Sequence, residues 1–410
     1  MKTSKHFQDT DLCVKCGLCV PHCPTYRKTL NENESPRGRI ALIQAWSKGN
    51  LEDTPALRGH LDNCLLCRTC ESLCPAQVPY ARLLDRFRST VGKGRQSIPV
   101  KVLSAISKTV LPSKRLSGIA ARIANELKAN RIMLGLSARF SLARRIQGIV
   151  DEIRFPQAAL QPLYATRYPR RGRVGLFTGC TGALFDANTI DAAIRVLDRL
   201  GYDVSVPREQ SCCGALHLHA GDADGAGGFA RRNLAAFQHN DLQAIVSLAT
   251  GCGAMLKEYP AYFPDSENFS ARVTDICEFV RQSDQRPNIK LEPLDADIMI
   301  HTPCSLANVL KTPEGPAVLV AAIPGIRITR LDQSFRCCGA AGTYMLEHPE
   351  MARALRQDLL DAVAEQRPDY LLTTNIGCAL HLKDGIRQQN LRTKVVHPIV
   401  LFGRQIQKSE

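Results

Sequence analysis

Eight of the seventeen cysteines in this 410-residue chain fall into two short runs of identical spacing, C-x2-C-x2-C-x3-C-P, offset by 51 residues. The runs are Cys13, Cys16, Cys19 and Cys23, and Cys64, Cys67, Cys70 and Cys74. This is the bacterial ligand spacing for two [4Fe-4S] clusters, in which the fourth cysteine of each run points to the sister cluster. We therefore expect crossed ligation by two sets of thiolates: Cys13, Cys16, Cys19 and Cys74, and Cys64, Cys67, Cys70 and Cys23. Two zinc sites are the alternative, but zinc favours pairs of ligands from separated knuckles.

The rest of the composition is typical of a globular protein, with 44% hydrophobic and 22% charged residues. An odd number of cysteines, eight of them needed as free thiolates, argues against a disulfide framework and for a reducing compartment. The N-terminus lacks the apolar region of a signal peptide, and no run of eighteen apolar residues occurs. We expect a cytoplasmic protein that can lie peripherally on the inner face of the cell membrane.

The net charge of +14 comes from one segment, because residues 93–173 hold 17 Lys and Arg against three acidic residues. Apolar residues recur there every three or four positions, as in Val102, Ile106 and Val110 and then Ile119, Ile123 and Leu127. This pattern predicts a basic helical segment that rests on anionic lipid or on an acidic partner subunit. A solvated linker is the alternative. No DNA- or RNA-binding signature accompanies the charge, so we expect no nucleic-acid partner.

The two cysteine runs are joined by a turn and a helix, which the segments 35–39 and 40–46 predict. Little apolar sequence remains once the cysteine loops are set aside, so the first domain should be small, helical and held together by its clusters. Arg37 and Arg39 lie in the turn and are candidates to offset the negative charge of thiolate-bound clusters. Two solvated surface arginines are the alternative.

From residue 173 the pattern changes to alternating strands and helices. Strands are predicted at 174–179, 202–206 and 244–248, with a helix at 187–200. This order builds a parallel sheet with right-handed crossovers, whose following loops emerge at one edge. Four cysteines on such loops should converge there: Cys180, Cys212, Cys213 and Cys252.

The same series appears a second time. Strands are predicted at 298–301, 326–331 and 370–375, and four cysteines repeat the first quartet at offsets of 124, 125, 125 and 126: Cys304, Cys337, Cys338 and Cys378. Cys277 has no counterpart and is predicted to be a buried apolar residue. We therefore predict a multidomain α+β chain of four parts: a ferredoxin-type domain (1–92), a basic helical linker (93–172) and two copies of an α/β Cys-Cys-Gly domain (173–290 and 291–410).

Each quartet combines two single cysteines with an adjacent pair followed by glycine. An adjacent pair at a helix N-terminus can give two thiolates to one metal centre. The quartets are therefore candidates for a third and a fourth [4Fe-4S] centre; structural zinc, a redox-active dithiol and buried free thiols are the alternatives. His217, His219 and His301 lie near the same loops and are candidates for a ligand or for a proton donor to a quinone.

The chain as a whole resembles the iron-sulfur subunits of glycolate oxidase. The resemblance covers nearly the full length and rests, besides the cysteines, on the segments 35–40, 247–253 with 257–259, 336–344 and 374–382. The wider family includes iron-sulfur subunits of lactate-utilisation systems, anaerobic glycerol-3-phosphate dehydrogenase and heterodisulfide reductase. The resemblance implies an electron-transfer subunit without a catalytic residue of its own. It would serve separate FAD-binding subunits that oxidise a 2-hydroxy acid, and would pass electrons to a quinone acceptor in the membrane.

One departure from the wider family bears on the chemistry. In heterodisulfide reductase each Cys-Cys-Gly domain ends in C-x2-C, whereas Met255 and His381 occupy those last positions here. This argues against disulfide-reducing chemistry and leaves four thiolates in each half. Two other functions stay open: a catalytic Cys-Cys-Gly subunit of a heterodisulfide-reductase-like, lactate or glycerol-3-phosphate dehydrogenase complex, and a zinc-stabilised scaffold.

The sequence lacks a dinucleotide-binding fingerprint. The glycine-rich segment 221–228 does not follow a predicted strand that would orient it over a phosphate. We therefore expect that this chain does not bind the flavin and, on its own, does not oxidise a hydroxy acid.

Overall fold

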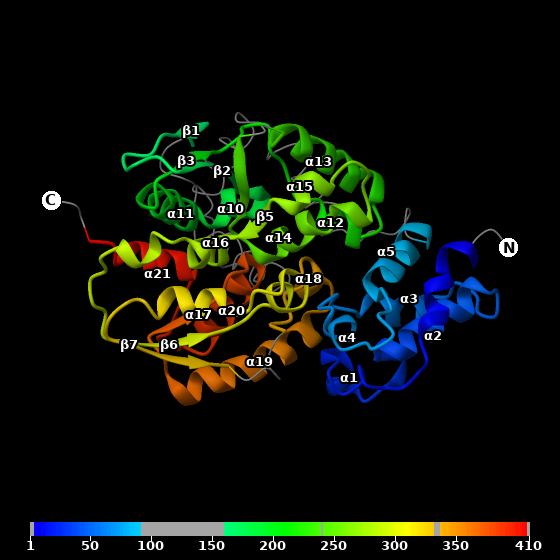
Figure 1. Ribbon diagram of the computed structural model, residues 1–410. Helices are drawn as coiled ribbons and strands as arrows, with labels where there is room; N and C mark the ends of the chain where they lie inside the picture. The colour runs from blue at the N-terminus through cyan, green and yellow to red at the C-terminus, as the bar shows by residue number, and fades with distance from the viewer. Residues whose placement is uncertain (1–3, 92–159, 239–240, 332–336, 408–410) are drawn as a thin grey trace, which may run out of the picture.

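The computed structural model describes residues 4–91, 160–238, 241–331 and 337–407. An N-terminal helical part lies to one side of two α/β halves, each built on its own sheet (Figure 1). Predictions made for residues 93–159, including most of the basic segment, lie outside the described residues. Among the helices within the described ranges, none has the length and apolarity needed to span a bilayer.

The N-terminal part is helical, as predicted. Its elements are η1 (Ser4–Leu12), α1 (Pro24–Thr29), η2 (Glu32–Glu34), α2 (Pro36–Ser47), α3 (Pro55–Asp62), α4 (Thr69–Ser72) and α5 (Tyr80–Val91). Helix α2 begins at a proline, and the Ser35 side chain caps it by accepting a hydrogen bond from Gly38 N at 3.0 Å. The small apolar core includes Ile43, Leu61 and Leu83 and packs directly against cysteines of both runs.

The first half carries a five-stranded sheet in the order β1-β3-β2-β4-β5. Its strands are β1 (Leu163–Tyr164), β2 (Gly172–Phe177), β3 (Tyr202–Ser205), β4 (Leu242–Ser247) and β5 (Val273–Asp275). Its helices are α10 (Gly179–Phe185), α11 (Ala187–Arg199), α12 (Ala215–His219), α13 (Ala223–Ala236), α14 (Thr250–Lys257), η4 (Tyr259–Ala261), α15 (Glu267–Ala271), α16 (Ile276–Gln282) and η5 (Arg286–Asn288).

The second half carries a four-stranded sheet in the order β7-β6-β8-β9. Its strands are β6 (Ala296–Ile300), β7 (Ile326–Arg330), β8 (Tyr370–Leu372) and β9 (Lys394–Val396). Its helices are the π-helical η6 (Leu306–Leu310), α17 (Gly315–Val320), α18 (Tyr344–Glu347), α19 (Pro349–Gln366), α20 (Ile376–Gln388) and α21 (Pro398–Arg404).

The two sheets repeat one topology. Strands β3-β2-β4-β5 match β7-β6-β8-β9 in order, and all of these pairings are parallel. The predicted duplication of a parallel α/β unit is therefore confirmed. Two strands end more than one residue earlier than predicted, β2 at Phe177 and β8 at Leu372, because the chain turns there to start α10 and, shortly afterwards, α20.

Strand β1 departs from the prediction. It pairs antiparallel with β3, although its residues belong to the segment predicted to be helical. The chain that follows β1 is held against the first half by ion pairs at 2.6–2.7 Å, which join Arg167 to Asp198, Arg170 to Asp203, Arg171 to Asp284 and Arg173 to Asp241. Four of the basic residues that we assigned to lipid or partner contacts are thus paired within the chain.

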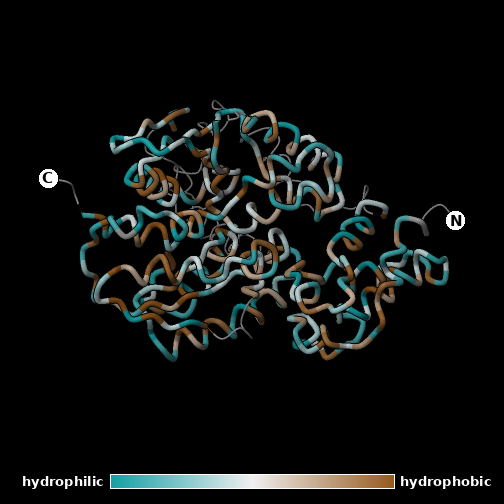
Figure 2. Tube along the Cα trace, in the orientation of Figure 1, coloured by the Kyte–Doolittle hydropathy of each residue, from teal (hydrophilic) through white to brown (hydrophobic). Residues whose placement is uncertain are grey.

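The two halves share one apolar core. Helix α21 of the second half packs on α11 of the first, and α16 of the first packs on α17 of the second. The apolar residues, brown in Figure 2, are concentrated in the strands and helices of both halves. Cys277 lies within this core on α16 with no exposed surface, as predicted for a cysteine without a counterpart.

Candidate metal centres

The first cysteine run forms a tight loop around a pocket. Lys15 and Gly17 have φ angles of 58° and 83°, so the loop passes twice through the left-handed region. The φ angle is the reason that glycine is favoured at position 17, because the nearest atom to a Cβ there, Arg37 Nη1 at 2.7 Å, is at the end of a flexible side chain. The cysteines that line this pocket are Cys13, Cys16, Cys19, Cys70 and Cys74.

The second cysteine run surrounds a neighbouring pocket. The cysteines that line it are Cys23, Cys64, Cys67 and Cys70. Cys23 immediately precedes the first residue of α1 and is buried. The structure thus places Cys74 beside the first loop and Cys23 beside the second. Cys70 borders both pockets, and if it is counted with the second, four thiols remain around each, which fits the donor set of a [4Fe-4S] cluster. The assignment of individual ligands stays a prediction.

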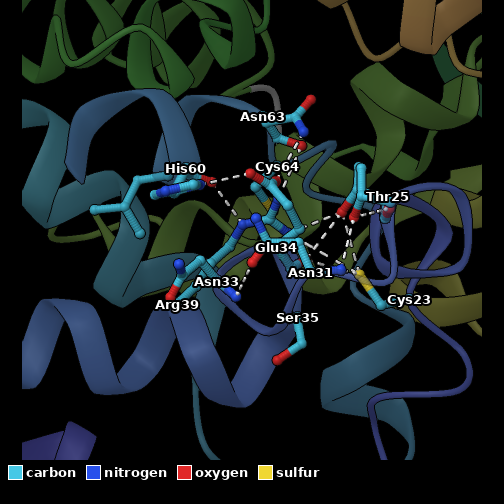
Figure 3. Close-up of polar contacts among 12 residues, drawn as sticks. Cys23, Thr25, Asn31, Asn33, Glu34, Ser35, Arg39, His60, Asn63 and Cys64 are labelled. Atoms are coloured by element: carbon cyan, nitrogen blue, oxygen red, sulfur yellow. Dashed lines mark hydrogen bonds and ion pairs between the residues drawn. The ribbon is translucent and has the colours of Figure 1, made fainter. Parts of the chain in front are cut away.

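The two arginines of the predicted turn lie in different environments. Arg37 is partly exposed and pairs with Glu32, with Nε 2.6 Å from Oε1. Arg39 is only 1% exposed and reaches between the second cysteine run and Cys23 (Figure 3). Of the two candidates for balancing cluster charge, only Arg39 is therefore a buried charge.

The first quartet converges where β2 and β4 end. Cys180 Sγ lies 3.5 Å from Cys212 Sγ, and the hydrogen bond between them is the main reason why the pKa of the Cys212 thiol falls well below its usual value. Cys213 interacts with both Cys212 and Cys252, and these hydrogen bonds raise its pKa. The predicted convergence is observed.

The second quartet converges at the matching positions. Cys338 Sγ lies 2.7 Å from Cys378 Sγ, and a hydrogen bond with Cys337 lowers the pKa of Cys304. Asn375, just before α20, donates from Nδ2 to Cys378 Sγ at 3.5 Å. Among the described side chains, no three His, Cys, Asp or Glu residues meet as a site for a single metal ion, so the metal content of both quartets stays a prediction.

The glycine of each Cys-Cys-Gly motif is required by a close backbone approach. Gly214 and Gly339 have φ angles of 89° and 78°. A Cβ atom would lie 3.2 Å from the carbonyl oxygen of Ala226 at Gly214, and 2.5 Å from that of Ala352 at Gly339. The glycine therefore lets the cysteine pair sit directly against a helix, α13 in one half and α19 in the other.

The second cysteine run lies against the second quartet. Burial and then the nearby thiol charge of Cys304 raise the pKa of Cys67, and Cys67 and Cys337 pack on the same small apolar cluster. Asn308 of η6 donates from Nδ2 to Cys67 O at 2.7 Å and to Thr69 Oγ1 at 3.1 Å. These contacts fix the loop of the second run to the second half.

The N-terminal part also binds the first half through buried polar contacts. Asp85 of α5 is 1% exposed, lies 2.9 Å from His219 Nδ1, and accepts a hydrogen bond from Tyr262 Oη at 3.0 Å. Burial raises the pKa of Asp85. The charge of His219 and the hydrogen bonds from His219 and Tyr262 lower it by more than burial raises it, so the pKa is below its usual value. Arg68 forms an ion pair with Glu258. The N-terminal part therefore rests on both halves.

The predicted histidines have protein partners. His217 Nδ1 lies 2.8 Å from Asp222 Oδ2, and His301 Nδ1 lies 3.0 Å from Thr373 Oγ1. His219 joins the contact with Asp85 described above. A role for any of the three as a ligand or proton donor is not tested by these contacts.

The two residues that replace a fifth cysteine are buried in different settings. Met255 packs in the apolar cluster that contains Cys212 and Cys213. His381 Nε2 lies 3.2 Å from Ala352 O, and burial lowers the pKa of His381 to about 4.

Some residues of the site carry no local signal in the sequence. Asn233 donates from Nδ2 to Cys212 O at 2.9 Å, and Tyr259 donates from Oη to Cys213 O at 2.9 Å. Together they hold the backbone of the cysteine pair from α13 and η4. Tyr259 lies in a segment that carries the family resemblance, which is the one signal that points to it; Asn233 has none.

Comparison with protein families matches the two parts separately. Residues 9–78 match the 4Fe-4S dicluster domain, and residues 174–257 and 298–383 each match the cysteine-rich domain. The dicluster match indicates two [4Fe-4S] clusters in the N-terminal part, as the cysteine spacing predicted.

Comparison with individual proteins extends the similarity to the whole chain. The chain is 33% identical over 411 residues to the glycolate oxidase iron-sulfur subunit of Escherichia coli (strain K12), and the match covers 97% of this chain and 94% of that protein. It is 30% identical over 412 residues to the probable glycolate oxidase iron-sulfur subunit of Bacillus subtilis (strain 168), with 93% and 90% coverage. At this identity and coverage, the chain belongs to the family of glycolate oxidase iron-sulfur subunits.

Proposed function

We propose that this chain is the iron-sulfur electron-transfer subunit of a flavin-dependent 2-hydroxy-acid oxidase, with glycolate as the expected substrate of the complex. Separate FAD-binding subunits oxidise the hydroxy acid, and a quinone in the membrane receives the electrons. The chain works at the cytoplasmic face of the membrane as a peripheral component. Two relatives of nearly the same length that are named as oxidase iron-sulfur subunits support this proposal.

The observation that carries the proposal is the contact between the second cysteine run and the second quartet. Cys67 lies beside Cys304 and packs on the same apolar cluster as Cys337. The two halves also meet near their quartets, because Thr250 N, two residues before Cys252, donates at 3.1 Å to the carbonyl oxygen of Thr374, four residues before Cys378. These contacts support a path for electrons from the N-terminal part into the second half and on toward the first.

The residues of this chain have three tasks in that proposal. The two crossed sets would hold [4Fe-4S] clusters, which when bound accept and release single electrons over a wide range of potentials. The quartets Cys180, Cys212, Cys213, Cys252 and Cys304, Cys337, Cys338, Cys378 would hold two further centres, either [4Fe-4S] or zinc. Apolar packing around the thiols limits access of water, and the contacts at Asn308 and Asp85 fix the spacing between the parts.

A metal analysis of the anaerobically purified chain tests the site assignment. The dicluster domain alone accounts for about eight irons per chain. More iron indicates that the quartets carry clusters, whereas zinc indicates closed structural sites. Cys213→Ser and Cys338→Ser should lower the metal content beyond the first eight irons, while Cys277→Ser, a buried cysteine outside both quartets, should leave it unchanged. Equal metal content in all of these variants would contradict a metal in the quartets.

Anaerobic co-purification with mass spectrometry tests the partners. We expect FAD-binding oxidase subunits among the co-purified proteins, and no flavin on the isolated chain. Recovery of the chain without any flavoprotein would contradict the proposal.

The partial exposure of Cys304 and Cys337 favours a catalytic Cys-Cys-Gly edge as the second candidate function. That function predicts that the purified chain reduces a disulfide or a quinone when it is given electrons directly. No such turnover is expected if the chain is a conduit that needs its partners.

A further inference from the structure

A buried ion pair lies next to the second cysteine run. Arg39 is 1% exposed, and its Nη2 lies 2.5 Å from Glu34 Oε2, whose side chain is 8% exposed. Figure 3 shows Arg39 and Glu34 between the loop of Cys23 and Thr25 on one side and His60 and Cys64 on the other. Burying both charges is costly unless each is fully hydrogen-bonded.

The hydrogen bonds orient this ion pair, so that its positive end faces the cysteines. Arg39 Nη1 faces Cys23 Sγ at 4.0 Å and donates to Thr25 Oγ1 at 3.0 Å, whereas Nη2 faces Glu34. The Glu34 carboxylate receives a second hydrogen bond from Asn63 Nδ2 at 2.7 Å, and its other oxygen lies 2.7 Å from His60 Nδ1. The positive end of the pair thus points at a cysteine, and the carboxylate is held by other groups.

Further contacts keep the guanidinium in place. Arg39 Nε donates to His60 O at 2.7 Å, and Nη2 donates to Asn63 O at 3.1 Å. Burial lowers the pKa of Arg39, but the thiolate charge of Cys64 is the largest of the effects that raise it above its usual value, and the charge of Cys23 adds to it. An arginine side chain stays charged in a folded protein. The guanidinium of Arg39 is held at the second pocket by geometry, because Nη1 lies 4.0 Å from Cys23 Sγ and Nη2 donates to the carbonyl of Asn63, the residue before Cys64.

The first pocket has no buried positive charge among the described residues that line it. Lys15 is exposed there, and Arg37 is partly exposed while Glu32 binds its Nε and Nη2. Water and the Glu32 carboxylate screen the charge of Arg37. Arg39 is buried away from water, where the effective dielectric constant is lower and Coulomb energies are several-fold larger.

We propose that Arg39 is a positioning residue that holds a fixed positive charge at Cys23 and Cys64 and thereby gives the cluster of the second pocket a higher reduction potential than the cluster of the first. The inference rests on the proposed function, since it presumes that both pockets hold [4Fe-4S] clusters. Reduction adds one negative charge to a cluster. A nearby positive charge stabilises that reduced form, and the potential rises.

Opposite signs are expected for the two members of the pair. Arg39→Gln removes the positive charge and should lower the potential of the second-pocket cluster. Glu34→Gln leaves the guanidinium without its counter-charge and should raise it. Arg39→Lys keeps the charge and should restore most of the parent value, and Arg37→Gln is the matched control at the first pocket. A role in folding alone would not produce shifts of opposite sign.

The experiment is an anaerobic redox titration of the full-length protein, followed by EPR of the reduced clusters, with iron content measured on each sample. Cys64→Ser identifies which signal belongs to the second pocket. We expect at least a tenfold change in the reduction equilibrium of that cluster, about 59 mV for one electron, downward in Arg39→Gln and upward in Glu34→Gln. In Arg37→Gln, the reduction potential of the second-pocket cluster should change by less than a third of that shift.

Three results would overturn the proposal. One is an unchanged second-pocket potential in Arg39→Gln, and another is a downward shift in Glu34→Gln. The third is a parent protein whose second-pocket cluster has the lower potential. If Arg39→Gln loses its iron, the sign of the shift in Glu34→Gln decides alone. A parent protein without iron would instead refute the proposed function, and the iron measurement separates the two failures.

Discussion

Cys23 and Cys74 are the two residues that separate crossed from uncrossed ligation, since each is the last cysteine of one run and lies beside the pocket of the other. We predict that Cys23→Ser alters the EPR signal of the cluster held by Cys64, Cys67 and Cys70. Cys74→Ser should alter the signal of the cluster held by Cys13, Cys16 and Cys19. EPR of the reduced variants checks both, with Cys277→Ser as a control that should keep both signals. A Cys23→Ser change confined to the cluster of its own run would show that ligation is not crossed.

Asp275, at the start of α16, is predicted to make stability depend on pH. Burial raises its pKa to about 7, although backbone amides of Cys277 and Glu278 donate hydrogen bonds that lower it. Its Oδ2 atom has no hydrogen-bond partner within the described parts of the chain. The usual pKa of Asp is about 3.9. The folded protein therefore binds more protons than the unfolded chain between pH 4 and 7, and stability from this group is lost as pH rises through that window.

Asp275→Asn removes this titration and keeps a side chain that can cap the helix. We expect the variant to gain stability over the parent at pH 8, by about 4 kcal/mol at most from linkage, and to gain less at pH 5. Apparent melting temperatures under anaerobic conditions at both pH values measure the difference. The same offset between variant and parent at pH 5 and pH 8 would contradict the raised pKa.

At the residue scale, the repeated cysteine spacing predicted which thiols line the two N-terminal pockets, except that Cys70 borders both. The convergence of each quartet was predictable from the strand order, because the loops that follow parallel strands emerge at one edge of the sheet. Neither pattern could separate Arg37 from Arg39, which are two residues apart in one turn. Their difference depends on His60 and Asn63, which lie more than twenty residues away and close over Arg39 alone. Contacts of this kind come from packing between elements, which the spacing of residues in one segment does not encode.

The contact between η6 and the second cysteine run is one of those that join the N-terminal part to the second half, together with Lys28 to Asp358 and Tyr344 to Asn63. Asn308→Ala removes both hydrogen bonds from this contact and leaves Cys67 O without its partner. We expect local opening of residues 64–72 to become easier by about 1–2 kcal/mol, which hydrogen exchange measures as lost protection. Asn288→Ala, at an exposed position where the side chain donates to Gln285 Oε1, should leave this segment unchanged. Unaltered exchange in Asn308→Ala would mean that other contacts hold the loop.

The element order of the two halves was predictable, because the strand-helix pattern and the matched cysteine offsets repeat along the chain. Strand β1 was not, since a two-residue strand has no periodicity of its own and depends on β3 for its pairing. The packing of α21 on α11 and of α16 on α17 across the two halves was equally hidden. Each helix is apolar enough to be buried, but its sequence does not state which sheet it covers.

The charge of the whole molecule has one predicted consequence. The excess of basic residues lies in 93–173, and four of them pair with aspartates of the first half. We predict that changing Arg139, Arg144 and Arg145 together to Glu weakens binding to anionic membranes or to the flavoprotein partner and leaves iron content unchanged. High salt should do the same, because the Debye length falls from about 10 Å at 0.1 M to about 3 Å at 1 M.

Sedimentation with membranes and recovery with the partner measure this effect. Reversal of three exposed basic residues elsewhere, Arg208, Lys290 and Arg392, provides a control of equal charge change. If both triple variants and high salt leave binding unaltered, the segment is a solvated surface with no docking role.

The central claim is that this chain carries electrons released by a separate hydroxy-acid-oxidising flavoprotein. Its most direct test is anaerobic EPR of the oxidised full-length protein mixed with its co-purified flavoprotein subunits and glycolate. We predict that signals of reduced [4Fe-4S] clusters appear only when all three are present. Cluster reduction by glycolate in the isolated chain without flavin, or no reduction in the complete mixture, would contradict the claim.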